Sequence, residues 1–87
     1  MFTVEQIKTK LKDIFFDVIG FDPFEEDTFY KDGIVRRFCL DPFDIVDLIM
    51  KMERNFNFEL SEAEAEKTKD MNIDQLVDFV SSKCSKN

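Results

Sequence analysis

The segment from Leu40 to Phe56 constrains the fold most, because it has the pattern of one amphipathic helix. Asp41 can accept hydrogen bonds from the free amides of a first helical turn, and Pro42 suits the next position, where no N–H is needed. The spacing therefore predicts that a helix begins at this point. One face of this helix is a predicted core stripe, formed by Ile45, Leu48, Ile49, Met52 and Phe56.

A second apolar patch lies on the opposite side of the same predicted helix. It consists of Phe43, Val46 and Met50, which helical spacing brings together. Either another helix of the chain covers this patch, or the patch is a partner surface surrounded by charged side chains. The second interpretation is preferred here. The predicted partner-binding residues are Asp41, Phe43, Asp44, Val46, Asp47, Met50, Glu53 and Arg54.

The composition of the 87 residues limits the possible functions. This length predicts a single domain, residues 1–87, with one modest core. Nineteen acidic against 12 basic side chains give a net charge of −7, which disfavours nucleic acid and favours a basic partner surface. The chain has no histidine and only two glycines, so we expect no catalytic residue, no metal site and no phosphate-binding loop. We therefore do not expect an enzyme.

The cysteines and the hydropathy pattern bear on the compartment. Cys39 and Cys84 lie far apart and form no CxxC pair, which predicts two reduced thiols in an intracellular protein. No run approaches the ~20 apolar residues that a membrane span needs, and the amino end lacks a signal-peptide pattern. We expect no membrane span. A targeting segment that had been removed would leave no trace in this sequence.

The amino-terminal part of the chain predicts another long helix. Thr3 and Gln6 have the spacing of a capping box, and Gly20 can adopt the left-handed conformation that ends a helix. Apolar side chains recur on one face between these points, and we expect them in the core. They are Ile7, Leu11, Ile14, Phe15 and Val18.

Residues 21–39 form a long connection without a sustained period. Pro23 and Gly33 interrupt it, and a short turn of helix is expected within it because long structureless loops are uncommon in compact domains. Its acidic cluster, which includes Asp22, lacks the alternating pattern of a calcium loop, so we expect solvated charge. The apolar residues expected to pack on the core are Phe24, Phe29, Ile34 and Phe38.

The carboxyl-terminal part predicts two more helices. Ser61 and Glu64 form a second capping box, which starts a short helix, and Asn72 caps the last helix. The last helix should fray from Ser81 onward, where the sequence becomes polar. Its predicted core residues are Ile73, Leu76, Val77 and Val80. The fold class is all-α, a four-helix bundle with three long helices, one short helix and a long first connection.

The segment Leu40–Leu48 resembles the motif of the acyl carrier protein family, Leu-Asp-Ser-Leu-Asp-x-Val-Glu-Leu. The similarity continues without a gap to Lys67, and the amino-terminal helix and the ending Val77–Val80 fit as well. The segment Phe56–Leu60, Phe-Asn-Phe-Glu-Leu, looks nearest to mitochondrial members, which carry Phe-Gly-Phe-Glu-Ile there. A short insertion around 33–38 departs from the family pattern. The resemblance implies an acyl-carrier-protein-like bundle.

One residue departs from the family in a way that affects chemistry. The family carries a phosphopantetheine arm on the serine of its motif, and that position is Pro42 here, which offers no hydroxyl for attack on coenzyme A. Thr28 and Ser61, the nearest hydroxyls, lie well away in sequence. We therefore expect no phosphopantetheine. A direct thioester on Cys39 is conceivable because helix amides lower a thiol pKa, but a semi-buried, inert cysteine is the preferred interpretation.

Together these features predict a divergent, non-enzymatic carrier-like module that binds a helical partner with a basic surface through its acidic second helix. The mitochondrial members that it resembles dock onto small helical LYR-motif proteins, including one in iron–sulfur cluster assembly. The resemblance thus implies such a partner and the mitochondrial matrix, with the cytoplasm or a plastid as other compartments. Phe43 replaces a family leucine and Arg54 a family acid, which changes the expected contacts. The alternative function is a working acyl carrier in fatty acid biosynthesis with a displaced attachment site.

Overall fold

A computed structural model describes residues 2–24 and 33–85, and every regular secondary-structure element among these residues is a helix. The predicted all-α class is thus confirmed. Among the described residues, no helix has the length and hydropathy needed to cross a membrane. The short turn of helix expected in the first connection is present as a separate helix, so the described chain has five helices instead of four. They are α1 (Val4–Ile19), α2 (Ile34–Phe38), α3 (Pro42–Phe56), α4 (Glu62–Thr68) and α5 (Ile73–Ser85).

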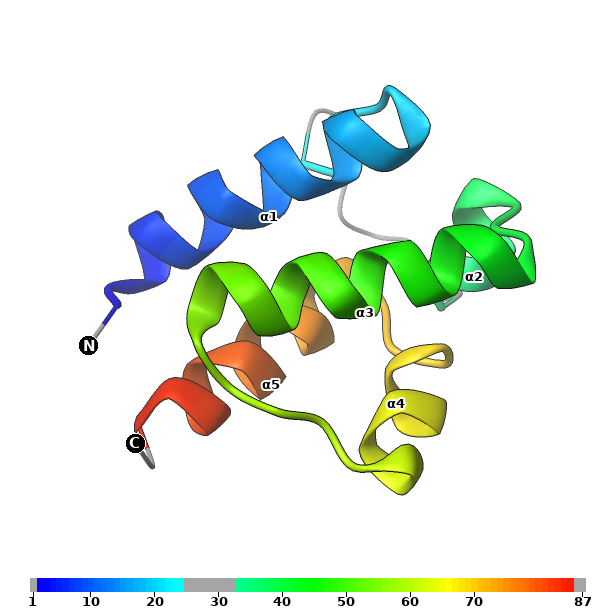
Figure 1. Cartoon of the computed structure of the whole chain (residues 1–87). Coiled ribbons are helices and arrows are strands. Elements are labelled where there is room, and N and C mark those ends of the chain that lie inside the picture. Colours follow the sequence, from blue (N-terminus) through cyan, green and yellow to red (C-terminus); the bar gives the residue numbers. More distant parts are fainter. Residues whose placement is uncertain (1, 25–32, 86–87) are drawn as a thin grey trace.

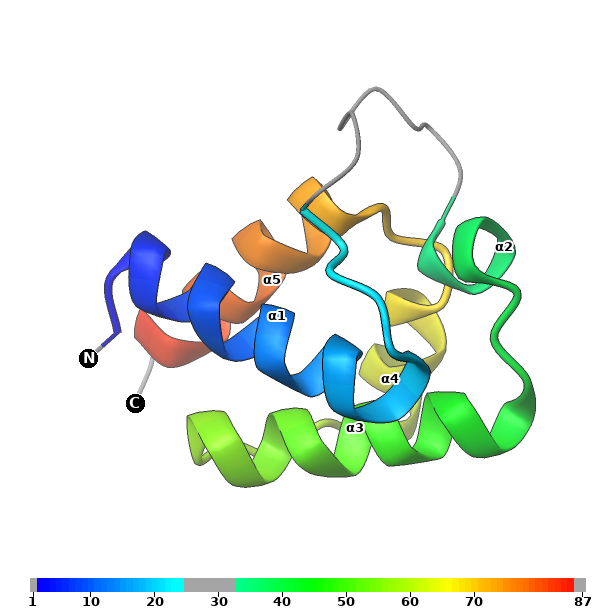
Figure 2. The same ribbon diagram turned by 90° about the horizontal axis from the view of Figure 1, so that it is seen from above.

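The long helices pack around one core. α1 and α3 run side by side in opposite directions (Figure 1). The view from above shows α1 lying over the space between α3 and α5, and α1 contacts both of them (Figure 2). α1 begins and α5 ends at one pole of the bundle, whereas α2 and the start of α3 lie at the other pole (Figure 1). None of the described helices covers one long side of α3.

The core is built from the predicted apolar stripes. The ring of Phe15 in α1 meets Phe38 of α2 edge-on with centroids 5.7 Å apart. Phe56, at the end of α3, packs edge-on against Phe2 at 5.5 Å and stacks on Phe58 at 5.8 Å. The predicted core residues that are buried are Ile7, Leu11, Ile14, Phe15, Leu48, Met52, Phe56, Ile73, Leu76, Val77 and Val80. Val18, Ile45 and Ile49 are half-buried at the edge of this core.

The helix ends are those that the capping patterns predict. Thr3 and Gln6 exchange both capping hydrogen bonds at the start of α1, and Gly20 ends that helix with a left-handed φ of 75°. Ser61 forms the corresponding box at the start of α4. Because each box satisfies amides that the helix itself leaves free, these short sequence signals determine where the helices begin.

The first connection packs more tightly than the sequence suggested. Asp22 was expected to be solvated charge, but its carboxylate accepts the Phe24 amide at 2.9 Å and lies 3.7 Å from the ammonium of Lys12. As predicted, Ile34 is buried, and Phe24 and Phe38 pack at the core edge. The predictions for Phe29 and for the acids Glu25, Glu26 and Asp27 fall outside the described residues.

The prediction that α5 frays from Ser81 is wrong. The helix continues to Ser85, and Cys84 is only 6% exposed. Helical spacing places Cys84 in line with Val77 and Val80, so the apolar stripe continues through a segment that is otherwise polar. Lys83 adds an ion pair to Glu64 of α4 at 3.1 Å. Both contacts hold the end of α5 on the bundle.

Candidate functional site

Two carboxylates hold the amino-terminal end of α3. Asp41 accepts a hydrogen bond from the Asp44 amide at 2.8 Å, and the Asp41 amide donates to Asp44 Oδ2 at 3.2 Å. Pro42 is the first helical residue, where its fixed φ fits and no N–H is required. The predicted helix start is confirmed. The carboxylates of Asp41 and Asp44 thus cap the helix end, and their contact with a partner stays a prediction.

The second apolar patch is exposed to solvent. Phe43, Val46 and Met50 are 85%, 54% and 51% exposed. The interpretation in which another helix covers them is therefore wrong. Asp47 and Arg54 are also exposed and lie on the same side of α3 by helical spacing. We call the side formed by Phe43, Val46, Asp47, Met50 and Arg54 the open face.

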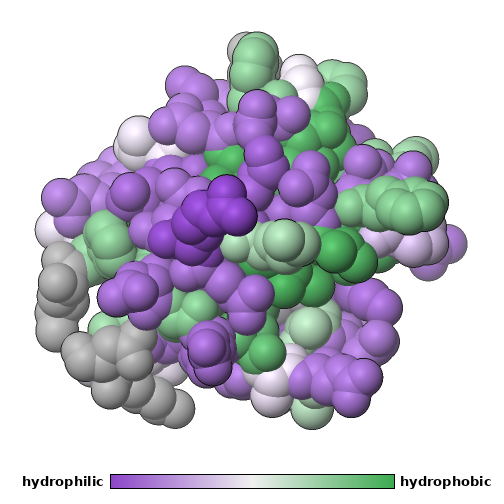
Figure 3. All heavy atoms as spheres, in the orientation of Figure 1, coloured by the Kyte–Doolittle hydropathy of each residue, from purple (hydrophilic) through white to green (hydrophobic). Residues whose placement is uncertain are grey.

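The open face can be followed on the molecular surface. In the space-filling view, hydrophobic patches lie at the centre and right of the region where α3 runs in Figure 1, with hydrophilic side chains around and between them (Figure 3). An apolar strip with a charged border is typical of surfaces that bind other proteins, whereas isolated exposed apolar side chains need no such explanation.

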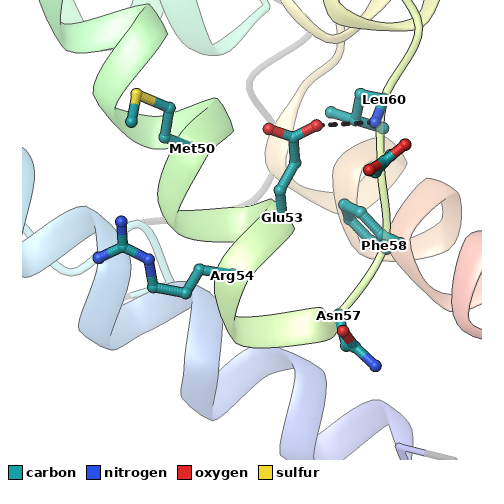
Figure 4. A pocket seen from close by; sticks show the side chains of 7 residues that line it. Met50, Glu53, Arg54, Asn57, Phe58 and Leu60 are labelled. Carbon is teal, nitrogen blue, oxygen red and sulfur yellow. Dashed lines mark hydrogen bonds between the residues drawn. The ribbon is translucent and has the colours of Figure 1, made fainter.

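The two flanks of α3 are tied to the rest of the bundle. On one flank, Lys51 forms an ion pair with Asp17 of α1. The hydrogen bond that Lys51 donates to Asp17, with a smaller contribution from the charge of Asp47, raises the pKa of Lys51 above its ordinary value of 10.5. On the other flank, Glu53 accepts the Leu60 amide at 2.9 Å (Figure 4). The Glu53 carboxylate thus holds the connection between α3 and α4, and its contact with a partner stays a prediction.

An open hollow lies at the carboxyl-terminal end of the open face. Its volume is about 780 Å³, and side chains of α3 form one wall while the segment after α3 forms the other (Figure 4). Sequence reasoning missed this hollow, because it depends on how the segment after α3 lies beside the helix, where the Leu60 amide donates to Glu53. The lining residues are Met50, Glu53, Arg54, Asn57, Phe58, Glu59 and Leu60.

A much smaller space lies inside the bundle, between α2, α3 and α4. Val35, Ile49 and Thr68 are among the residues that line it, one from each helix. Its volume is about 10 Å³, which is about the room that one water molecule occupies. The described interior is therefore closely packed at this point.

Comparison with known proteins gives two informative relatives. An acyl carrier protein of Bdellovibrio bacteriovorus is 38% identical over 63 residues, which are 72% of this chain and 78% of that protein. An acyl carrier protein of Buchnera aphidicola subsp. Acyrthosiphon pisum is 30% identical over 80 residues, 92% of this chain and 95% of that protein. The chain belongs to the acyl carrier protein family. No protein-family model and no solved structure matches it.

For this acyl carrier protein family member, the structure also locates the groups that could carry chemistry. Cys39 is exposed, so the expectation of a semi-buried thiol is wrong. It ends α2 in the left-handed conformation, with φ 53°. The hydroxyl of Ser61 caps α4, and Thr28 lies outside the described residues. Within residues 2–24 and 33–85, no group of three His, Cys, Asp or Glu side chains is placed to hold a metal ion.

Proposed function

We propose that this acyl carrier protein family member carries no phosphopantetheine arm and acts as a non-enzymatic subunit that binds a partner protein through α3. Pro42 supports the first part, because it takes the motif position where the family has its serine and has no hydroxyl to modify. Proline at the first helical position is also compatible with the fold. The scaffold can therefore persist without the acceptor.

The exposure of the open face is the observation that carries the binding function. Phe43, Val46 and Met50 together form an apolar strip that the described part of the chain leaves exposed. Burial of an aromatic ring supplies much of the energy of a protein interface. A phenylalanine directly after Pro42 thus offers surface contact at the place where an arm would otherwise project. The structure supports docking by contact alone.

The space between α2, α3 and α4 limits what the bundle can hold in the state described. An acyl chain bound inside the bundle would need far more room than the 10 Å³ between α2, α3 and α4. Enlarging that space would separate side chains such as Ile49 and Thr68, and loss of core contacts lowers stability. An acyl carrier with a displaced attachment site would have to open this space to hold its cargo there.

We further propose that the partner is a helical protein with a basic surface. Asp47 lies within the open face, and the whole chain has a net charge of −7. Both the local carboxylate and the net negative charge attract basic side chains. The similarity of Phe56–Leu60 to mitochondrial members supports a LYR-motif protein of iron–sulfur cluster assembly in the mitochondrial matrix as that partner. Such a partner would have to rely on surface contacts.

The test has two arms, and the first concerns the phosphopantetheine site. The purified protein and the variant Pro42→Ser are incubated with coenzyme A and a promiscuous phosphopantetheinyl transferase, and intact masses are measured. We expect no mass change for the protein and a gain of one arm for Pro42→Ser. An arm on the unsubstituted protein would establish the displaced-site alternative. Failure of both proteins to gain an arm would show that residue 42 is not at the acceptor position.

The second arm measures binding to a recombinant LYR-motif protein of iron–sulfur cluster assembly by calorimetry. We expect Phe43→Ala and Asp47→Lys each to weaken binding at least about ten-fold, the loss that follows from about 1.4 kcal/mol of contact energy. Phe21→Ala is the matched control, because Phe21 is an exposed ring outside α3. Equal affinities of all four proteins would contradict docking through the open face.

A further inference from the structure

The open face carries a protruding side chain at one end and a hollow at the other. Phe43 is the most exposed of the large apolar residues in the described chain, and it lies at the start of α3. The hollow lies at the end of α3, where Asn57, Phe58 and Leu60 contribute to its wall (Figure 4). Phe43 and Asn57 are about 21 Å apart along the helix axis, at 1.5 Å per residue. The ring of a chain therefore cannot reach its own hollow.

The charges of the open face are also arranged in a complementary way. Asp47 and Arg54 have opposite signs and are separated by nearly two helical turns, so they project from the same flank. Neither side chain forms a hydrogen bond or ion pair with another described residue, whereas Glu53 and Lys51 beside them are both engaged. Asp47 and Arg54 are thus available to a binding partner.

We propose that the open face binds a second copy of this chain, with the two α3 helices antiparallel about a two-fold axis. In such an isologous contact, the same surface of each copy contributes, and the same flank of each helix faces the other. An axis placed midway between Asp47 and Arg54 brings the aspartate of each copy opposite the arginine of the other. The charge pattern of α3 is therefore complementary to itself.

The same axis matches the shapes of the two surfaces. Met50 lies next to the midpoint, so the two methionines meet at the centre of the contact, where their flexible side chains can adapt. Phe43 of one copy then lies opposite Asn57 and Phe58 of the other, at the hollow that Phe58 and Leu60 line. One arrangement thus covers the exposed ring, fills the hollow and pairs both free charges.

The size of this contact and the net charge indicate a weak, reversible dimer. One helix face on each side buries less than the roughly 1,200 Å² of a standard interface. The charge of −7 on each copy opposes association, but salt at about 0.15 M screens charges beyond about 8 Å and leaves the close pairs in place. We expect monomers in dilute solution and dimers at high protein concentration.

Sedimentation equilibrium of the complete chain, with reductant present to keep Cys39 free, tests the proposal. We expect the average mass to rise toward that of a dimer as the concentration approaches about 1 mM, a range that detects even weak association. Phe43→Ala should weaken the dimer at least ten-fold, and Phe21→Ala should not change it. Circular dichroism checks that each variant is folded, as expected for substitutions of exposed residues.

Charge reversal gives a sharper test of the arrangement. Asp47→Arg and Arg54→Asp each place like charges opposite each other, so each variant alone should associate at least ten-fold more weakly. An equimolar mixture of these two variants should form a mixed dimer, because complementary pairs are then restored. The mixed dimer has the same total charge as the unsubstituted dimer, so its formation reports on the pairing and not on net charge.

Three outcomes would overturn the proposal: a monomer at every concentration, a dimer that Phe43→Ala leaves unchanged, or variants that fail to associate when mixed. These outcomes are independent of the proposed function. A strictly monomeric protein that binds its partner through the open face would disprove the dimer alone. A dimeric protein that accepts a phosphopantetheine arm would disprove the proposed function alone.

Discussion

Pro42 and Phe43 are neighbours at the start of α3, and their side chains differ in what they contribute to the fold. Pro42 supplies a fixed φ to the first turn and removes an amide that the helix does not need. Phe43 contributes almost no buried area to the monomer. Covering such a ring is worth about 1.5–3 kcal/mol, and this stabilisation is available to whichever protein covers it. Folding therefore constrains residue 42 and places little constraint on residue 43.

Gly33 leads to a prediction at the same scale. A Cβ at this position would lie 2.8 Å from the carbonyl carbon of Asp70 and 2.8 Å from the oxygen of Lys69. Beside it, the Ile34 amide donates to the Met71 carbonyl at 2.7 Å, which fixes this approach. Because backbone atoms cannot move aside cheaply, Gly33→Ala should lower the free energy of unfolding by about 1–3 kcal/mol. Urea denaturation measures this change.

Gly20→Asn is the matched control for that measurement. Gly20 has a φ of 75°, but a Cβ added there would meet no atom within 4 Å. Asparagine tolerates the left-handed conformation, so the loss should stay below about 1 kcal/mol. Equal losses for the two variants would show that the close approach of Gly33 to residues 69–70 does not constrain the fold.

At the scale of helices, the sequence predicts some elements much better than others. The starts of α1, α3 and α4 follow from capping boxes, because both partners lie within one turn. The full extent of α5 could not be predicted, because it depends on burial of Cys84 by other helices. The hollow lies between α3 and the connection that follows it, and the Glu53–Leu60 hydrogen bond links these two segments. Exposure of Phe43 likewise required the positions of all neighbouring helices.

The contact between α4 and α5 predicts a dependence of stability on pH. The Ser61 amide donates to Glu64 at 3.0 Å and Lys83 lies 3.1 Å away, and these contacts lower the pKa of Glu64 below its ordinary value of 4.5. A lowered pKa means that the ionised carboxylate stabilises the fold above pH 4.5, and that this stabilisation disappears as the pH falls through the lowered value. The protein should therefore be more stable than Glu64→Gln near neutral pH, with the difference vanishing in acid.

Urea denaturation from neutral pH down to about pH 3 measures this difference. This range is needed because a carboxyl group titrates over about two pH units around its pKa. Glu62→Gln is the control, because Glu62 lies in the same turn of α4 and is exposed. Its effect should be small and should not follow the same pH profile. A Glu64→Gln variant as stable as the unsubstituted protein at neutral pH would contradict the role assigned to this carboxylate.

For the molecule as a whole, the two thiols report how tightly the bundle is closed. Cys39 is exposed, whereas Cys84 lies in the core and its burial raises the pKa of its thiol. A thiol reagent should therefore modify one cysteine of the folded protein rapidly. Cys84 should react only as fast as the bundle opens, because it is buried and its raised pKa leaves little of the reactive thiolate. Absorbance of a chromogenic disulfide reagent gives both rates.

The variant Cys39→Ser assigns the two phases of that reaction. It should lose the rapid phase and keep the slow one, and denaturant should then make the remaining thiol react at once. A rapid reaction in Cys39→Ser without denaturant would show that the end of α5 leaves the bundle readily. That result would return the carboxyl-terminal segment to the frayed state that its polar sequence suggests.

The placement of the helices has a practical consequence for handling the protein. α1 begins and α5 ends at the pole opposite the start of α3 (Figure 1). A fluorescent label or an immobilisation tether attached beyond α5 would therefore project away from Phe43. Biosensor surfaces and fusion reporters can be built at that pole while the ring stays accessible from solution.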